Sequence, residues 1–185
     1  KIPKAVKEIC DCCEKKPSVV MICITCVDAL LGTDMERVCR KAEEKVDIPV
    51  RPCYMYALTR EGRKPPMVHV RQSLYSLLEP QKKKGNVVNL LGFFSPIVDD
   101  CELYELLHGA GIKAIHEISR CRDFEEYKTM SEANFNLVLH QESRFAAEDF
   151  NDRLNIPFIE LRRLYQTDKI QNQYQALASV LGVKF

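Results

Sequence analysis

Short apolar runs alternate with amphipathic stretches along the whole chain. The first run, residues 18–25 (SVVMICIT), is rich in β-branched side chains and has the length of a strand that is buried on both faces of a parallel sheet. We predict a helix after it, through residue 46, because apolar side chains then recur at helical spacing. Thr33 and Glu36 have the spacing of a capping box near the start of this helix. Its apolar stripe consists of Leu31, Met35, Val38 and Ala42.

A second strand, a loop and a helix follow. Residues 48–58 (IPVRPCYMYAL) predict a strand, which Pro52 makes irregular or an edge because proline lacks the amide hydrogen that a sheet ladder uses. Residues 59–66 (TREGRKPP) predict a loop, and residues 68–78 predict a helix. The polar run at residues 82–85 (KKKG) then marks a domain boundary.

Four more strand-like runs follow the boundary, and a helical stretch comes after each of them. This alternation predicts an α/β fold of parallel sheets with helices on both faces, in doubly wound units like those of Rossmann and flavodoxin folds. We expect residues 1–80 to belong to an incomplete N-terminal α/β domain, and residues 86–185 to form a second domain around a four-stranded parallel sheet. The four runs are residues 86–92, 112–118, 135–140 and 156–161.

Three helices of the second half begin with a repeated acidic pattern, in which Glu or Gln follows an Asp by three residues. An Asp in this position can accept hydrogen bonds from the free amides of the first turn. The last helix is predicted to end at Gly182, since glycine is common just after a helix. The pairs are Asp99 with Glu102, Asp123 with Glu126, and Asp168 with Gln171.

The two halves share a short sequence pattern. Residues 46–50 (VDIPV) resemble residues 154–158 (LNIPF), and in both places a helix is predicted to end where an Ile-Pro strand begins. Two interpretations stay open at this point. The pattern marks either two similar α/β units or a common way of entering a strand.

Charge and cysteine content exclude several classes of function. The 27 basic and 26 acidic residues leave a net charge of +1, which attracts neither nucleic acid nor an anionic membrane. No apolar stretch approaches the ~20 residues of a membrane helix. The nine cysteines are odd in number and unevenly spaced, unlike the disulfide framework of a secreted protein. We therefore expect a cytoplasmic protein with reduced thiols or metal ligands. Because the chain begins with Lys1 rather than Met, we also expect a segment of a longer protein.

Chemistry in an open parallel sheet is expected at the carboxyl ends of the strands. Cys23 and Cys26 form a C-x-x-C at the end of the first strand. Cys23 lies within the strand run, so we expect it to be a buried structural cysteine, whereas Cys26 lies where the chain turns towards a helix. His140 ends another strand, where it is either a ligand or proton donor, or only a hydrogen-bonded side chain.

The other cysteines give weaker signals. Cys10, Cys12 and Cys13 lie on a predicted helix over residues 5–15, where three thiols can assist a metal site. Cys10 and Cys13 also have the spacing of one packed helical face, which is the interpretation we prefer. The remaining cysteines are isolated and are expected in the core or on the surface; they are Cys39, Cys53, Cys101 and Cys121.

Residues 22–38 (ICITCVDALLGTDMERV) resemble a stretch of the nitrogenase component 1 family, in which a strand ends in Thr-Cys and a turn leads to Ile-Gly-Asp-Asp. Residues 88–92 (VNLLG) and 148–160 (EDFNDRLNIPFIE) resemble later elements of the same family. The likeness extends over nearly the whole chain, but only the first stretch is specific. The family includes subunits of nitrogenase, cofactor-assembly subunits and subunits of dark protochlorophyllide reductase.

The resemblance implies a role for Cys26. The matching cysteine of the family is an iron–sulfur cluster ligand near a subunit interface, so residues 1–80 are expected to belong to a cluster-binding domain. The partner cysteines come from a region that precedes the residues present here, so no stably bound cluster is expected on this segment alone. The implied partners are a homologous subunit, in a homo- or hetero-oligomer, and an ATP-dependent reductase that donates electrons.

Two positions depart from the family pattern. Thr33-Asp34 stands where the family has an Asp pair. The cysteine that anchors a molybdenum-type cofactor in the catalytic subunits is expected at Leu139, His140 or Gln141, and none of these is a cysteine. His140 and Gln141 are therefore the candidate cofactor-binding residues, and we do not expect a dinitrogen-reducing catalytic subunit of the usual kind.

Three hypotheses about function follow. The first is a segment of a nitrogenase-like oxidoreductase subunit that holds an iron–sulfur cluster and passes electrons to a bound substrate; alone, this segment is expected to be inactive. The second is a scaffold for the assembly of a metallocofactor. The third is a flavodoxin-like domain that binds a small ligand at its strand ends. No residue is assigned as catalytic.

Overall fold

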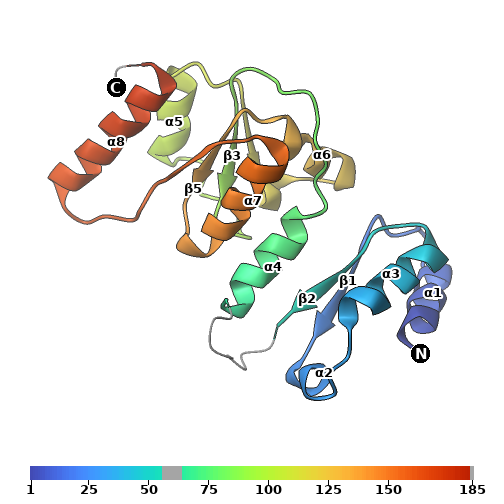
Figure 1. Cartoon of the computed structure of the whole chain (residues 1–185). Coiled ribbons are helices and arrows are strands. Elements are labelled where there is room, and N and C mark those ends of the chain that lie inside the picture. The colour runs from blue at the N-terminus through green and yellow to red at the C-terminus, as the bar shows by residue number, and fades with distance from the viewer. Residues whose placement is uncertain (56–63, 184–185) are drawn as a thin grey trace. The chain divides into compact units, whose positions relative to one another are not determined.

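A computed structural model describes residues 1–55 and 64–183 (Figure 1). The chain divides into two compact units, Lys1–Leu77 and Leu78–Phe185. Most of the predicted loop at residues 59–66 and the last residues of the predicted strand at 48–58 lie outside the described residues. No helix in the described part of the chain has both the length and the apolar character needed to cross a membrane.

The first unit is built around two parallel strands, β1 (Val20–Ile24) and β2 (Val50–Tyr54). Their ladder runs in register from Val20 opposite Val50 to Ile24 opposite Tyr54. Val20, Ile22 and Val50 pack with a core that α1 and α3 supply, so these helices cover one face of the pair. The helices of this unit are α1 (Ile2–Cys12), α2 (Cys26–Leu30), α3 (Met35–Val46) and α4 (Pro66–Tyr75).

The predicted single helix through residue 46 is wrong, because the chain forms two helices, α2 and α3, in its place. Gly32 lies between them at φ 62°, a left-handed conformation that interrupts helical hydrogen bonding. The predicted cap is also displaced by one residue. Asp34, rather than Thr33, accepts a hydrogen bond from the Arg37 amide at 3.0 Å.

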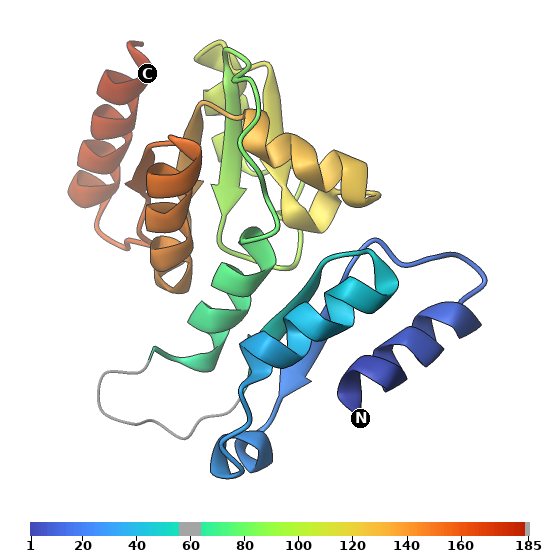
Figure 2. The same ribbon diagram turned by 45° about the vertical axis from the view of Figure 1, so that its right-hand side comes forward.

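The second unit has a four-stranded parallel sheet in the order β4-β3-β5-β6. Its two central strands, β3 and β5, are labelled in Figure 1, and Figure 2 shows the same sheet from another direction. The prediction of parallel strands with intervening helices is confirmed. Its strands are β3 (Val87–Leu91), β4 (Ala114–Glu117), β5 (Phe135–Val138) and β6 (Phe158–Glu160). Its α-helices are α5 (Glu102–Gly109), α6 (Phe124–Lys128), α7 (Arg144–Leu154) and α8 (Thr167–Leu181), and three short 3₁₀ turns are η1 (Ile118–Arg120), η2 (Thr129–Glu132) and η3 (Gln141–Ser143).

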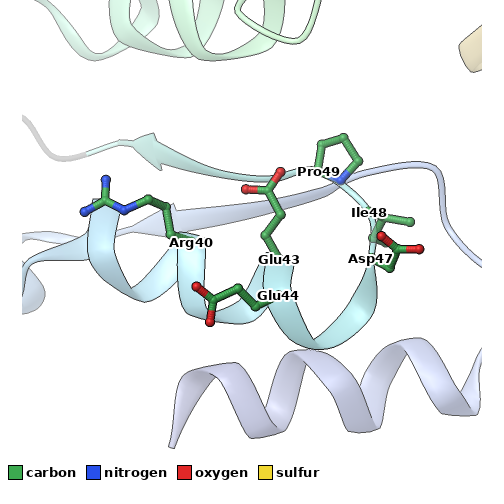
Figure 3. Close-up of a pocket in the computed structure, with 6 residues that line it drawn as sticks. All are labelled: Arg40, Glu43, Glu44, Asp47, Ile48 and Pro49. Carbon is green, nitrogen blue, oxygen red and sulfur yellow. The ribbon is translucent and has the colours of Figure 1, made fainter.

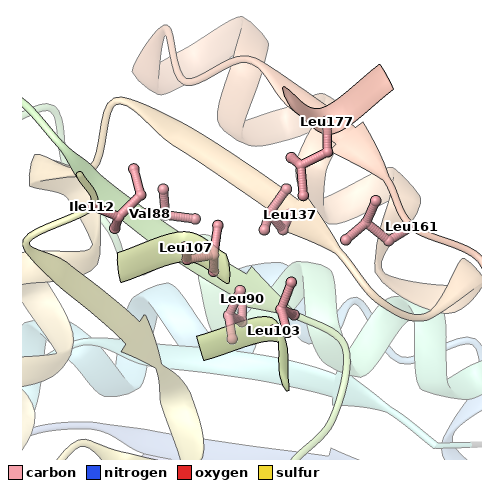
Figure 4. Packing of buried hydrophobic residues seen from close by; sticks show 8 residues of the cluster. All are labelled: Val88, Leu90, Leu103, Leu107, Ile112, Leu137, Leu161 and Leu177. Atoms are coloured by element: carbon pink, nitrogen blue, oxygen red, sulfur yellow. The ribbon is translucent and has the colours of Figure 1, made fainter. Parts of the chain in front are cut away.

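All five residues of β3 are buried, which requires helices on both faces of the sheet. On one face, α5 and α8 pack against the strands through an apolar cluster (Figure 4). On the other face, Asn89 and Asn136 form a fully buried amide pair at 2.7 Å. The apolar cluster comprises Val88, Leu90, Leu103, Leu107, Ile112, Leu137, Leu161 and Leu177.

Only one of the three predicted acidic caps is formed. Asp123 accepts from the Glu126 amide at 2.8 Å at the start of α6, as predicted. Asp99 instead pairs with Arg120 at 2.6 Å, and α5 has no side-chain cap. Asp168 lies inside the first turn of α8 and does not cap it. The end of α8 at Gly182 is confirmed, with φ 71°.

The shared pattern at residues 46–50 and 154–158 has the same structure in both units. Asp47 follows α3 and Asn155 follows α7, and each has φ 53° in the left-handed region. A parallel strand begins a few residues later in both cases. Of the two open interpretations, the structure favours two similar β-α-β units, β1-α3-β2 and β5-α7-β6.

Candidate functional site

The crossover connections run in opposite directions from β3 and β5, so the strand order reverses between them. The chain leaves β3 through α5 to reach β4 on one side, and leaves β5 through α7 to reach β6 on the other. Doubly wound sheets bind ligands at the carboxyl ends of two strands related in this way, because the following loops separate and leave a crevice. The candidate site of the second unit is therefore the region after Leu91 and Val138.

The two segments that follow β3 and β5 come very close to each other. The Leu139 amide donates to the Leu91 carbonyl at 2.7 Å, which extends the ladder by one step. A Cβ on Gly92 would lie 3.0 Å from the Cβ of Leu139 and 3.2 Å from the nitrogen of His140. Only glycine fits here without displacing backbone, so the local sequence brings His140 directly against the end of β3.

A pocket of about 500 Å³ opens beside this contact. It contains His140 and Gln141, the two residues predicted from the sequence, and it adds side chains from the ends of β3 and β6. Its volume is in the range of small-molecule sites. The lining comprises Phe93, Leu139, His140, Gln141, Glu160, Leu161, Arg162 and Arg163.

One nitrogen of His140 is held by the protein. Nδ1 accepts a hydrogen bond from the Glu142 amide at 3.3 Å, so the imidazole caps the short turn η3. When the ring is neutral, this bond places its proton on Nε2. Phe93 contacts the ring edge-on, with centroids 5.7 Å apart. His140 is therefore oriented, and Nε2 is the atom left for a ligand.

Two arginines after β6 make the pocket cationic. Gln173 of α8 fixes the backbone of Arg162 with two hydrogen bonds, one to its amide at 2.7 Å and one to its carbonyl at 3.1 Å. The Arg162 side chain is largely exposed and approaches Glu160 at 3.6 Å. Arg163 is also exposed and has no carboxylate partner within the described part of the chain. Two guanidinium groups with one paired carboxylate favour an anionic ligand.

A buried carboxylate holds the loop that carries Phe93. Glu117, at the end of β4, accepts hydrogen bonds from the Ile97 amide at 3.2 Å and from the Tyr104 hydroxyl. Arg120 donates to Glu117 at 3.0 Å and to the Ile97 carbonyl at 2.7 Å. Burial and the Glu117 hydrogen bond raise the pKa of Tyr104 to about 12. These contacts fix the backbone of Ile97, four residues after Phe93.

In the first unit, Cys26 is the first residue of α2, directly after β1, and its side chain is exposed. The prediction that it lies where the strand gives way to a helix is confirmed. Apolar side chains beside it are also exposed, with Val27 59%, Leu30 79% and Leu31 74% accessible.

The chain matches the family described as "Nitrogenase component 1 type Oxidoreductase" over residues 1–185. It belongs to this family. It is 26% identical to a protein from Nostoc sp. named "Nitrogenase iron-molybdenum cofactor biosynthesis protein NifE", over 98% of this chain and 38% of that protein. A protein of the same name from Clostridium pasteurianum is 25% identical, over 98% of this chain and 40% of that protein.

Solved structures agree on the fold. A chain described as "Nitrogenase Cp1 at pH 5" superimposes with a TM-score of 0.72 at 19% identity, over 98% of this chain and 37% of that one. A second, "Nitrogenase Cp1 at pH 6.5", gives a TM-score of 0.69. The chain thus spans about two fifths of the length of the relatives and structures that it matches.

The possible metal ligands near Cys26 and in the His140 pocket limit which groups each of these two sites can hold. Among the described residues, no three of His, Cys, Asp or Glu come close enough to hold a metal ion together. Cys26 fits an iron–sulfur cluster as one exposed thiolate, and the other ligands that such a cluster needs (about four in all) must come from elsewhere. No cysteine lines the pocket at His140, so the described residues do not fit a cofactor that is anchored there by a thiolate.

The structure corrects two predictions about cysteines. Cys23 was expected to be buried, but it is exposed, because it lies on the face of β1 that α1 and α3 do not cover. Cys13 was expected to pack with Cys10, but Cys10 is buried and Cys13 is exposed beyond the end of α1. Cys12 is also exposed.

Sequence reasoning missed Phe93, Arg162 and Arg163 as pocket residues. The signal was present, since all three follow strand ends, where ligands of parallel sheets gather. A second hollow at the end of α3 was not predicted either (Figure 3). It is acidic and shallow, and none of the predicted site residues lines it. Its residues are Arg40, Glu43, Glu44, Asp47, Ile48 and Pro49.

Proposed function

We propose that the full-length protein is a scaffold subunit, which holds a metal–sulfur cluster as cargo and then transfers it to an acceptor. The curated relatives support this, because they are named as cofactor biosynthesis proteins. The chain covers less than half of each relative. The activity proposed here therefore belongs to the whole protein and not to this segment alone.

The observation that carries the proposal is the donor set of the His140 pocket. The cargo is an anionic cluster, and Arg162 and Arg163 offer positive charge where the pocket opens. Imidazole at His140 and an amide at Gln141 supply neutral donors, while no cysteine lines the pocket. Soft thiolate holds such iron more firmly than these donors do. A pocket without thiolate therefore binds a cluster in a form that can be released.

Three of the lining residues, His140, Arg162 and Phe93, have distinct parts in this scheme. His140 presents Nε2 to the cargo, since Nδ1 is engaged by the Glu142 amide. Gln173 holds the backbone of Arg162 with two hydrogen bonds, so the side chain of Arg162 starts from a fixed position beside the pocket. Phe93 contacts the imidazole edge-on and restricts its orientation. The Glu117 contacts keep the Phe93 loop in place.

Cys26 has a separate role in the proposal, as one ligand of a resident iron–sulfur cluster. Its exposure beside Val27 and Leu30 supports a site that is completed by another segment or by a homologous subunit. The thiolate of Cys26 would bind iron directly. When bound, such a cluster supplies one-electron transfer.

The exposed position of Cys26 also favours a second candidate, a nitrogenase-like oxidoreductase subunit. In that function Cys26 would be one ligand of a cluster that supplies electron transfer, an ATP-dependent reductase would be the electron donor, and the His140 pocket would hold the substrate. The two candidates differ in one measurable property. A scaffold loses its cargo to an acceptor without reductase, whereas an oxidoreductase turns over a substrate only with reductase and ATP.

The test measures loading of the pocket. The full-length protein and its homologous subunit are purified without oxygen, incubated with ferrous iron and sulfide, and assayed for bound iron in excess of the resident cluster. Arg163→Glu should lower this excess at least several-fold, because it places a negative charge against an anionic cargo. Lys113→Glu makes the same charge change before the start of β4, at the opposite edge of the sheet, and should leave loading unchanged.

Equal loading by wild type and Arg163→Glu would contradict the proposal. So would a loss of equal size in Lys113→Glu, since the effect would then follow net charge rather than the pocket. A small organic anion that binds the pocket and survives loss of Cys26 would instead favour a flavodoxin-like binding domain.

A further inference from the structure

Two cysteines of the first unit lie opposite each other in the parallel ladder of β1 and β2. Cys23 and Cys53 are Cα partners in the register. Directly opposed residues of neighbouring strands point to the same face of the sheet. Residues 20 and 22 pack towards α3, so alternation puts Cys23 and Cys53 on the face away from that core.

The two thiols differ in their surroundings. Cys23 is exposed, whereas Cys53 is 4% accessible. Burial, and after it the neighbouring Cys23, raise the pKa of Cys53 to about 11. An accessible thiol thus lies opposite a protected one in the ladder of β1 and β2.

We propose that Cys23 and Cys53 are a reversible dithiol/disulfide pair, with Cys23 as the accessible thiol that reacts first and Cys53 as the thiol that closes the bridge. Neighbouring strands lie about 4.8 Å apart, inside the range of roughly 4.4–6.8 Å that separates the Cα atoms of disulfide-linked residues. The Cβ atoms of directly opposed strand residues stand about 4.5–5.5 Å apart, farther than the roughly 3.8 Å typical of a relaxed disulfide. The bridge is therefore easily reduced.

Cys26 is the other candidate partner of Cys23, and the geometry disfavours it. An extended chain advances about 3.3 Å per residue, so a residue three positions along lies farther away than the opposed residue of the next strand. Cys26 also belongs to α2, beyond the end of β1. The bridge to Cys53 therefore leaves Cys26 free for its own role.

The chemistry needs an oxidant, and a low-molecular-weight disulfide, RSSR, supplies it. The Cys23 thiolate attacks one sulfur of RSSR, forms a mixed disulfide and releases one RSH after protonation. The Cys53 thiol then loses its proton, and its thiolate attacks the Cys23 sulfur and releases the second RSH. The sum is two protein thiols plus RSSR giving one protein disulfide plus two RSH. Two electrons pass from the protein to the oxidant.

The buried partner makes the second step slow near neutral pH. Only the thiolate reacts, and the Cys53 thiolate is scarce well below pH 11. The mixed disulfide on Cys23 should therefore accumulate first. Its closure should accelerate about tenfold per pH unit between pH 7 and pH 10, in proportion to the thiolate fraction.

The experiment treats the folded full-length protein with glutathione disulfide at several pH values, quenches with acid and maps the linked peptides by mass spectrometry. The expected result is glutathione on Cys23 at early times, then a peptide pair joining Cys23 to Cys53, and full recovery of both thiols with a dithiol reductant. Cys23→Ser should abolish the bridge. Cys12→Ser, at another exposed cysteine, should leave it unchanged.

Cys53→Ala should trap the mixed disulfide on Cys23. If that variant does not fold, the wild-type peptide map decides the matter alone. A bridge between Cys23 and Cys26 would overturn the assignment. So would a mixed disulfide on Cys23 that never closes at any pH while the protein stays folded.

Discussion

Gly92 lies so close to His140 that a methyl group on Gly92 would be 3.2 Å from the His140 backbone nitrogen. This contact joins the ends of β3 and β5, where the candidate pocket opens. Gly92→Ala should lower the free energy of unfolding by about 1–3 kcal/mol, because the new methyl group overpacks against backbone that cannot rotate away. It should also weaken loading of the pocket, since His140 must shift. Urea unfolding and bound-iron assays measure the two effects.

Gly85→Ala is the matched control. A Cβ at Gly85 would meet nothing within 4 Å. Its unfolding free energy should therefore stay near that of the wild type. Equal stabilities for Gly92→Ala and wild type would show that the strand ends are not constrained as described.

Replacing the left-handed residues Asp47 and Asn155 with glycine should stabilise the folded protein. Both have φ 53° at the ends of helices, where side chains are disfavoured. Asp47→Gly and Asn155→Gly should each raise the unfolding free energy by up to about 1 kcal/mol. Gly182→Ala makes the reverse change at φ 71° and should destabilise the end of α8. Thermal and urea unfolding of the three variants check these directions, and destabilisation by both glycine substitutions would contradict them.

The Tyr104 hydroxyl should make stability fall at alkaline pH. Its pKa in the folded protein is raised to about 12 by burial and by Glu117, against an ordinary value near 10. Between these pH values the folded state binds more protons than the unfolded state. The contribution of the Tyr104 hydroxyl to the free energy of unfolding is therefore complete below pH 10 and is lost as the pH rises through 12. Tyr104→Phe should remove this part of the slope. Curves for wild type and variant that stay parallel from pH 10 to 12 would contradict it.

Cys26 should be the cysteine among the described residues that binds iron in the intact protein. Cys26→Ala should lower the iron content of the anaerobically purified complex, because a direct thiolate ligand is lost. Cys23→Ala is the control, since Cys23 is also exposed and lies only three residues away. Iron analysis with a protein assay compares them. Unchanged iron in Cys26→Ala together with iron loss in Cys23→Ala would reverse the assignment.

The sequence predicted the parallel strands well because their apolar runs are long and helices separate them. The end of α8 was also predictable, since Gly182 is a strong local signal. The break between α2 and α3 was missed, because the apolar stripe runs through Leu31 and hides the left-handed turn at Gly32. Asp99 was misassigned as a cap because its true partner, Arg120, is distant in sequence.

The candidate site was only partly predictable for a related reason. Cys26 and His140 could be found because each ends a recognisable strand. That His140 and Arg163 line the same pocket could be predicted only with the strand order, which places β6 beside β5. The pairing of Cys23 with Cys53 depended on the register of β1 and β2, which the pattern of one strand does not determine.

Transfer of cargo to an acceptor distinguishes a scaffold subunit from an oxidoreductase subunit. The intact complex is purified without oxygen, loaded with its cluster, and mixed with an acceptor apoprotein in the absence of reductase and ATP. The account predicts that iron and sulfide move to the acceptor, that Arg163→Glu transfers several-fold less because it loads less, and that the complex does not reduce acetylene. Three results together would contradict the scaffold function. The complex would retain its cluster, it would reduce acetylene only with reductase and ATP, and this subunit would carry stoichiometric molybdenum or vanadium.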